Sequence, residues 1–175
     1  DYEAVVAAAV ASYVLKGGLD ISVPSGGVSA IDLEKAYRLY GIDTQTFMEH
    51  FYILREPGLG EDLPNVIVFE PRSPEDVLNK IVELSRRLSE KFRKPPLWTI
   101  GVDTLVRILG EEALNLLALG QDYAKRAGSP VIWIVKPTRP WIVERLAPIA
   151  EIHLRITRRY GCILLYGIKP RTPLY

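Results

Sequence analysis

The stretch from residue 97 to residue 109, LWTIGVDTLVRIL, decides the fold class. Its first part, LWTIGV, is a short and mostly apolar run of the kind found in strands that are buried on both faces. Asp103 and Thr104 follow this run directly. In open α/β sheets, ligands bind at the carboxyl ends of the parallel strands. We therefore expect Asp103 to lie at that edge of the sheet, at the end of a central strand.

Asp103 is open to two interpretations from the residues alone. A carboxylate beside a hydroxyl offers the hard oxygen ligands that Mg²⁺ prefers. The same carboxylate can instead cap the turn that follows the strand, using Thr104 or nearby backbone amides. An apolar run that ends in Asp-Thr does not decide between a magnesium ligand and a turn cap.

Helical patterns and short apolar strands alternate along the rest of the chain. We expect strands at residues 19–23, 52–56, 66–70, 97–102 and 131–135, and helices at residues 2–16, 29–40, 42–51, 71–92, 111–127 and 140–149. Two further strands, 152–157 and 162–169, surround the sequence RRYG and predict an antiparallel hairpin. This order predicts a single α/β domain over residues 1–175, with a mostly parallel twisted sheet, helices on both faces and a C-terminal hairpin.

The composition is that of a folded globular domain. The chain has 175 residues, of which 48% are hydrophobic and 25% are charged, enough to bury a core. The apolar stretch AVVAAAVASYVL near the start is shorter than a membrane span, and we expect no membrane association. The scarcity of Gln, Met and Cys, which are thermolabile residues, favours a thermophilic source.

Cys162 is the only cysteine of the chain, so an internal disulfide is impossible. A single cysteine is typical of a reducing compartment, and we expect a cytoplasmic protein. On a strand, such a residue usually serves as a small core side chain, and we expect Cys162 to be buried.

Positive charge gathers at the C-terminal end. The net charge is +1, but the segment from Lys136 onward carries eight basic and two acidic residues. This asymmetry can mark a nucleic-acid face or a subunit interface, or it can be a plain solvated surface. Arg158, Arg159 and Tyr160, in the expected hairpin turn, are the candidates for contact with nucleic acid, which makes DNA a possible partner.

A phosphate-binding loop is missing from the sequence. Such a loop needs Gly-x-x-x-x-Gly-Lys-Ser/Thr, because glycine amides wrap the phosphates and the lysine reaches the β and γ oxygens. The chain contains no Gly-Lys dipeptide, and in KGGLDISVPSGG (16–27) the lysine precedes the glycines. We therefore expect no ATP hydrolysis by this chain as given. ATP and Mg²⁺ become expected cofactors only if an upstream segment supplies the loop, which the first residue, Asp1, leaves open.

The C-terminal sequence GIKPRTPLY carries two cations at alternate positions, Lys169 and Arg171. On an extended segment both point to one side, where they can reach the phosphates of a neighbouring molecule. Alternatively, the charges protect a sheet edge from aggregation.

Four segments together resemble the RecA-like ATPase core, in particular its archaeal RadA and KaiC-like branch. YRLYGIDTQTFMEHFYILREP (37–57) is similar to the family's helix, Gly-hydrophobic-Asp turn and following strand, and VIWIVKPT (131–138) is similar to its sensor strand. LWTIGVDTLVRIL resembles the Walker B strand, which implies that Asp103 takes the place of the metal-binding acid and Thr104 that of the usual hydroxyl. KPRT (169–172) resembles the Lys-x-Arg segment of KaiC-like proteins. This implies that Lys169 and Arg171 act in trans on the nucleotide site of the next subunit.

The chain departs from the family pattern at three places. It begins at the helix that normally follows the phosphate loop, Pro24 and Ser25 stand where the catalytic glutamate is expected, and Lys136 occupies the sensor position. An ATPase needs the phosphate cradle, the metal and the water-positioning base together.

The resemblance therefore implies a degenerate RecA-like paralogue that is a non-catalytic subunit or regulator, in DNA recombination or repair. Its partner would be a second copy or an active paralogue. Two alternatives stay open: a true ATPase whose Walker A segment lies outside these residues, and a nucleic-acid-binding module that uses the basic hairpin.

Overall fold

Five parallel strands form the centre of the molecule. The computed structural model describes residues 2–58, 63–92, 94–136 and 138–170. The strands are β1 (Asp20–Val23), β2 (Phe51–Arg55), β3 (Val66–Val68), β4 (Leu97–Gly101) and β5 (Val131–Ile134). Their order across the sheet is β3-β2-β1-β4-β5, and every neighbouring pair is parallel. The chain first builds outward from β1 to β3 and then returns to the other side of β1, so the direction of winding reverses between β1 and β4.

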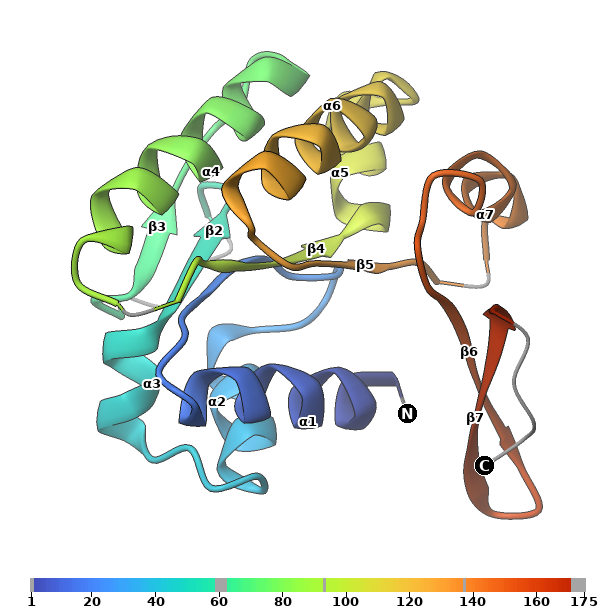
Figure 1. The fold of residues 1–175 in the computed structure, drawn as a ribbon, viewed down its shortest axis with the longest axis horizontal. Helices are drawn as coiled ribbons and strands as arrows, with labels where there is room; N and C mark the ends of the chain where they lie inside the picture. Colours follow the sequence, from blue (N-terminus) through green and yellow to red (C-terminus); the bar gives the residue numbers. More distant parts are fainter. Residues whose placement is uncertain (1, 59–62, 93, 137, 171–175) are drawn as a thin grey trace.

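Helices cover both faces of this sheet, as the sequence predicts (Figure 1). One face carries α1 (Tyr2–Leu15), α2 (Ala30–Arg38) and α3 (Thr44–His50), and the other carries α4 (Pro74–Ser89), α5 (Val102–Leu109) and α6 (Glu112–Ala127). Each side has its own hydrophobic cluster. Phe47 and Phe51 stack in the first cluster, and Leu84, Trp98 and Leu105 are buried in the second. The α/β fold class, with its sheet covered on two faces, is therefore confirmed.

Capping residues set the starts of α2 and α4. The Ser29 hydroxyl accepts the amide proton of Asp32, and the Asp32 carboxylate accepts the Ser29 amide in return, which forms a capping box. Ser73 caps α4 by accepting the amide proton of Asp76, and Pro74 stands at the first helical position.

The segment that follows β4 differs from the expectation. The sequence predicts a strand through Val102 and no element for the second apolar run, but α5 begins at Val102, immediately after the strand. Val102, Leu105 and Val106 are the buried positions of α5, which is the i, i+3, i+4 spacing of a helix. Short apolar runs are ambiguous between strand and buried helix, and packing against α6 resolves the ambiguity here.

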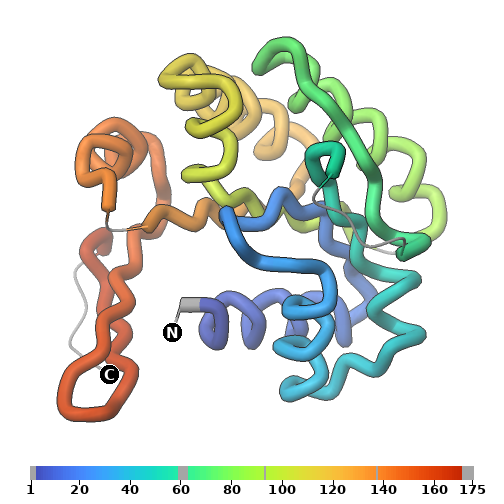
Figure 2. The backbone as a smooth tube through the Cα atoms, turned by 180° about the vertical axis from the view of Figure 1, so that it is seen from behind, coloured from blue at the N-terminus to red at the C-terminus, as the bar shows by residue number. Residues whose placement is uncertain are grey.

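A separate antiparallel hairpin, β6 (His153–Arg159) and β7 (Cys162–Lys169), follows the short helix α7 (Pro140–Leu146). Figures 1 and 2 show it standing beside the main body, on the side of β5. Tyr160 and Gly161 alone form the turn, both with positive φ, as in the tight turns that match the twist of a hairpin. Arg158 and Arg159, expected in the turn, belong to β6 instead.

Cys162 contradicts the expectation of a buried side chain. It pairs with Arg159 at the first position after the turn, and it is exposed. A hairpin that stands beside the body offers little core at its tip, so strand residues there stay in solvent.

Among the described residues, every helix is too short or too polar to cross a membrane.

Candidate functional site

Three neighbouring strands bring their carboxyl ends to one edge of the sheet. The loop 24–27 follows β1, α5 follows β4, and Lys136 comes soon after β5. The winding of the chain reverses between β1 and β4, and this is where open α/β sheets place their ligands. The predicted position of Asp103 at this edge matches the structure, although the residue lies in the first turn of α5 and not in the strand.

Asp103 binds the loop that follows the neighbouring strand. Its Oδ2 atom accepts the amide proton of Gly26 at 3.3 Å and lies 3.5 Å from Nζ of Lys136. The same ammonium donates to the carbonyl oxygen of Gly26 at 3.0 Å. Oδ1 of Asp103 is buried and has no hydrogen-bond partner. Acid, ammonium and loop backbone thus form one closed network.

Thr104 and Gly101 also contact this loop. The Thr104 hydroxyl donates to the Pro24 carbonyl oxygen at 2.7 Å. A Cβ atom on Gly101 would lie 2.5 Å from the backbone nitrogen of Ser25, which is closer than real contacts allow. Gly101 is therefore required by the close approach of the loop to the junction of β4 and α5. Gly101 could not be singled out from the sequence, since an isolated glycine gives no sign of the backbone it will meet. Gly26 belongs to a Gly-Gly pair, which indicates a turn but not its contact with Asp103.

The polar groups around Asp103 are largely engaged with other protein groups, and the assignment of Asp103 to magnesium stays a prediction. One carboxylate oxygen already receives an amide and an ammonium, and the Thr104 hydroxyl is committed to a carbonyl oxygen. Among the described residues, no group of three or more His, Cys, Asp or Glu could hold a metal. An ammonium 3.5 Å from the acid also opposes a divalent cation there.

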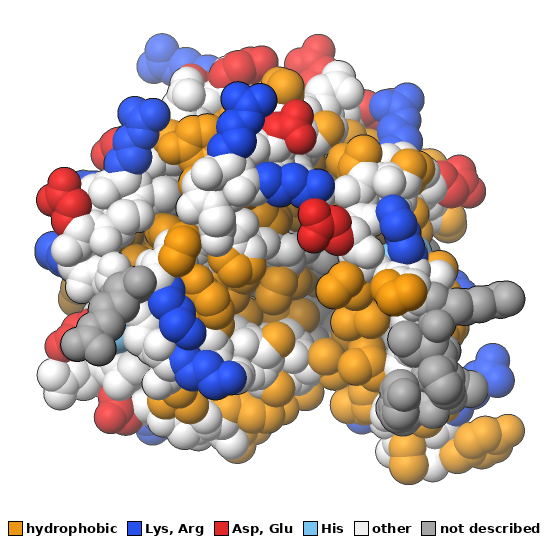
Figure 3. Space-filling model, viewed as in Figure 1, with side chains coloured by type: hydrophobic (Ala, Val, Ile, Leu, Met, Phe, Trp, Pro, Cys, Tyr) orange, Lys and Arg blue, Asp and Glu red, His pale blue; other side chains and the backbone are white. Residues whose placement is uncertain are grey.

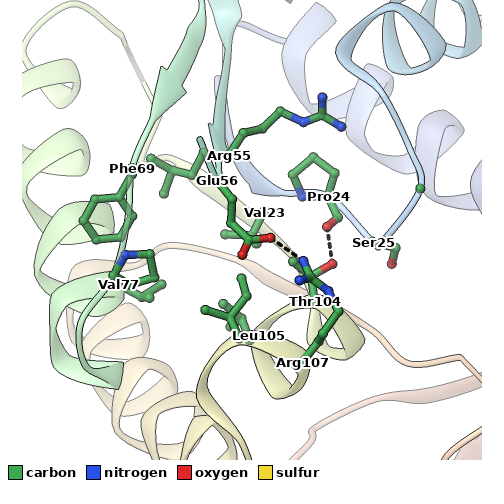
Figure 4. Close-up of a pocket in the computed structure, with 15 residues that line it drawn as sticks. Val23, Pro24, Ser25, Arg55, Glu56, Phe69, Val77, Thr104, Leu105 and Arg107 are labelled. Atoms are coloured by element: carbon green, nitrogen blue, oxygen red, sulfur yellow. Dashed lines mark hydrogen bonds and ion pairs between the residues drawn. The ribbon is translucent and has the colours of Figure 1, made fainter. Parts of the chain in front are cut away.

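A cavity of about 280 Å³ lies beside the 24–27 loop, whose residues form part of its wall. It opens between the ends of β1 and β2 and the first turns of α4 and α5 (Figure 4). Apolar side chains dominate its wall, among them Val23, Leu54, Phe69, Val77 and Leu105. A concave apolar pocket with a few polar groups is the usual form of a small-molecule site.

The charged side chains that line this cavity already have protein partners, whereas the buried Ser25 hydroxyl has none. Glu56 and Arg107 form an ion pair, and their charged ends point toward one another in Figure 4. Arg55 donates to the carbonyl oxygen of Val28. Thr104 lines the cavity, whereas Asp103 is not among its lining residues. Of the two predicted site residues, Thr104 therefore lines the cavity and Asp103 does not.

Three of the predicted cations, Arg158, Arg159 and Lys169, lie on the hairpin. Arg158, Arg159 and Tyr160 are exposed, and Tyr160 is 97% accessible. Nζ of Lys169 donates to the carbonyl oxygens of Pro148 and Ala150, at 3.2 and 2.7 Å, just past the end of α7. Arg171 lies outside the described residues, so its predicted position beside Lys169 stays a prediction.

Asp20 is a buried acid that the sequence analysis did not single out. It is fully buried at the start of β1, where Oδ1 accepts the Thr99 hydroxyl at 2.7 Å and Oδ2 has no partner. Burial raises the pKa of this carboxyl to about 7, against a smaller lowering by the Thr99 hydrogen bond. The sequence feature that could have indicated a buried acid is the position of Asp20 inside the apolar segment LDISV.

Comparison with known proteins gives a fold and no family. No protein-family model matches the chain, and no curated protein matches it. Among solved structures it is similar to the uncharacterized protein PH0321 from Pyrococcus horikoshii, solved in complex with an unknown peptide. The TM-score is 0.67 and the identity 10%, over 95% of this chain and 78% of that one. At this identity the likeness establishes a shared fold, and the function has to be argued from the site.

Proposed function

We propose that this chain is a non-catalytic subunit or regulator of the RecA-like type, which works by assembling with other polypeptides and not by hydrolysing ATP. One observation carries the proposal. Lys136 reaches over the loop after β1 and neutralises Asp103, the acid that the family resemblance would assign to magnesium. A carboxylate held in this way stabilises a loop, and it has no free oxygen pointing toward solvent for a metal.

The partner and the cellular process are inferred from the family resemblance alone. It favours a second copy or an active RecA-like paralogue as the partner, and recombination or repair of DNA as the process. The single cysteine of the chain favours a reducing, cytoplasmic compartment.

Nucleotide binding tests this proposal directly. We expect the full chain to show no Mg²⁺-dependent binding of a fluorescent ATP analogue and no ATP turnover above background. Lys136→Ala is the informative variant, because it removes the competing ammonium and leaves the carboxylate in place. Turnover by the unaltered chain that Asp103→Asn abolishes would overturn the proposal in favour of a true ATPase. Mass photometry, alone and with a RecA-like paralogue, then tests assembly, and a strict monomer under both conditions would contradict a subunit role.

A second candidate function, contact with single-stranded nucleic acid, rests on the hairpin tip. Tyr160 projects from the turn with nearly all of its surface exposed, and Arg158 and Arg159 precede it. Exposed aromatic rings stack on bases, and neighbouring cations bind phosphates.

Fluorescence anisotropy with a labelled single-stranded oligonucleotide tests this second candidate. We expect Tyr160→Ala and Arg159→Ala to weaken binding by about tenfold, and the affinity of the unaltered chain to fall steeply with salt. Arg126→Ala, an exposed cation at the end of α6, is the matched control. An affinity that does not depend on salt, or an equal loss of affinity in Arg126→Ala, would contradict nucleic-acid binding at the hairpin tip.

A further inference from the structure

The cavity beside the 24–27 loop has a floor that is shielded from solvent. Val23, Leu54, Val77 and Leu105 line this cavity of about 280 Å³, yet each of them is only 2–6% exposed. Figure 3 shows a hollow of another kind, on the surface between the body and the hairpin, where hydrophobic side chains gather. An extended polypeptide needs an open groove or a strand edge, because its backbone continues on both sides. A sheltered apolar floor, with a volume near the lower end of the range for ligand sites, suits a compact small molecule instead.

The wall of the cavity comes from separate parts of the chain. Figure 4 shows Val23 and Pro24 at the end of β1, Glu56 after β2, Val77 in α4 and Leu105 in α5. These parts meet at the carboxyl ends of the parallel strands, where open α/β sheets bind their ligands. A molecule in the cavity would therefore contact two strand ends and two helices at once.

One polar group of the wall lacks a protein partner. Ser25 lines the cavity and is 4% exposed, and its hydroxyl makes no hydrogen bond within the protein. Buried hydroxyls nearly always have a partner, because leaving the hydrogen bond unmade is costly. Thr104, a second lining hydroxyl, already donates to the Pro24 carbonyl oxygen. A hydroxyl or carbonyl group on a bound molecule would supply the partner that Ser25 lacks.

The charged side chains of the wall are compensated by protein groups. Arg107 and Glu56 form an ion pair and are more exposed than the floor, at 52% and 26%. Arg55 donates to the Val28 carbonyl oxygen, and its charge also lowers the pKa of Asp32, after the larger effect of the hydrogen bonds from Ser29. An ionised ligand would therefore lose its hydration without gaining an unpaired counter-charge from the described lining residues, which is costly.

We propose that this cavity is a binding site for a small, uncharged and largely apolar molecule that carries one hydroxyl or carbonyl group. Burial of its apolar part against the floor supplies most of the affinity, and the Ser25 hydroxyl fixes its orientation. Asp103 does not line the cavity. The proposed RecA-like role and this ligand site can therefore fail independently of each other.

The first test compares 2-naphthol, naphthalene and 2-naphthoate, which share one ring system and differ in one group. We expect saturable binding of 2-naphthol to the full chain with a dissociation constant of about 0.1 mM. The NMR signals of the Val23, Leu54, Val77 and Leu105 methyl groups should shift as it binds. Burial alone would make naphthalene bind more tightly, because it is the more apolar molecule. We expect it to bind about fivefold more weakly, and 2-naphthoate at least about tenfold more weakly.

Three results of this comparison would overturn the proposal. They are an absence of saturable 2-naphthol binding, methyl signals of the floor that do not shift, and binding of naphthalene or 2-naphthoate that equals or exceeds that of 2-naphthol. Methyl signals that shift with protein concentration, in the absence of any probe, would identify a second copy of the chain as the occupant and would also overturn it.

The second test removes the polar group. Because the Ser25 hydroxyl has no protein partner, Ser25→Ala should keep the fold. We expect its affinity for 2-naphthol to fall by about fivefold and its affinity for naphthalene to stay unchanged. A variant that still prefers 2-naphthol to the same degree would contradict the role of Ser25 in the site.

The third test fills the cavity. Ile108→Trp adds bulk at a half-buried lining position of α5, and Leu109→Trp is the matched control, since Leu109 is half-buried in the same helix but does not line the cavity. Urea denaturation establishes that both variants are folded. We expect Ile108→Trp to lose at least about tenfold in affinity for 2-naphthol and Leu109→Trp to keep it. Unchanged affinity in Ile108→Trp, or an equal loss in both variants, would count against the site.

Discussion

Lys136 and Asp103, which follow the neighbouring strands β5 and β4, form an ion pair with 3.5 Å between Nζ and Oδ2, and both bind the backbone of Gly26. The pair therefore joins the ends of three strands, because Gly26 belongs to the loop after β1. Both side chains are partly exposed. The pair therefore stabilises the fold more through its hydrogen bonds to Gly26 than through the attraction between the two charges.

A double-mutant cycle on this pair tests the network. We expect Asp103→Ala and Lys136→Met each to lower the free energy of unfolding by about 1 kcal/mol, because the first leaves the Gly26 amide and the second the Gly26 carbonyl oxygen without its side-chain partner. The double variant should lose less than the sum, with a coupling of about 0.5–1 kcal/mol, as urea denaturation would measure. Strict additivity would mean that the two side chains act independently.

Gly101→Ala should be strongly destabilising. The new Cβ would lie 2.5 Å from the nitrogen of Ser25 and 2.6 Å from its Cα, and backbone atoms cannot rotate away. We expect a loss of about 2 kcal/mol or more in the free energy of unfolding. Gly120→Ala is the matched control in α6, where the Cβ would meet Leu78 at an ordinary 3.5 Å. There we expect no loss and a gain of up to about 1 kcal/mol. A similar loss in both variants would contradict the argument from the loop.

Asp20 should make the protein less stable as the pH rises. Its pKa is raised from 3.8 to about 7 in the folded state, so folding favours the protonated form. The stabilisation from the protonated Asp20 is fully present below the pKa that this carboxyl has in the unfolded chain. It is lost as the pH rises through about 7, the pKa in the folded state. For this group alone we expect the free energy of unfolding to be roughly 2–3 kcal/mol lower at pH 8 than at pH 5.

Asp20→Asn should flatten that dependence, because the amide oxygen can still accept the Thr99 hydroxyl. Urea denaturation from pH 5 to pH 8 measures the effect. Asp32 provides a control of opposite sign, since hydrogen bonds from Ser29 lower its pKa and its contribution is lost only in acid. If Asp20→Asn keeps the full dependence of the free energy of unfolding on pH, a group other than Asp20 is responsible for it.

Cys162 should react with a thiol reagent in the folded protein. Because its side chain is exposed at the hairpin tip, we expect the native rate to lie within about tenfold of the rate in denaturant. Cys162→Ser should change the free energy of unfolding by less than about 0.5 kcal/mol. Full protection of the thiol in the native protein would contradict the exposed position.

Local patterns predicted most of the fold. The apolar run LWTIGV marked β4, and the alternation of elements predicted the parallel sheet. The start of α5 was missed because an apolar run of this length is ambiguous between a strand and a buried helix until its packing is known. Cys162 was misjudged because composition cannot tell a strand in the sheet from a strand in a separate hairpin.

The candidate site was less predictable, since its contacts join distant parts of the chain. Asp103 could be placed at the sheet edge from its position after a strand. Its partner Gly26 lies 77 residues away, and Lys136 reaches 110 residues back to the same loop. Such contacts depend on strand order, which no local pattern contains.

The separate hairpin also sets an order of events in folding. Tyr160 and Gly161 close it with contacts between near neighbours in sequence, and hairpins of this kind form in roughly 1–10 μs. In the sheet, Asp20 and Thr99 meet across 79 residues, and such distant pairings form slowly because a long loop must close first. We therefore expect refolding followed by pulse-labelled amide exchange to protect residues 153–169 well before the pairing of β1 with β4.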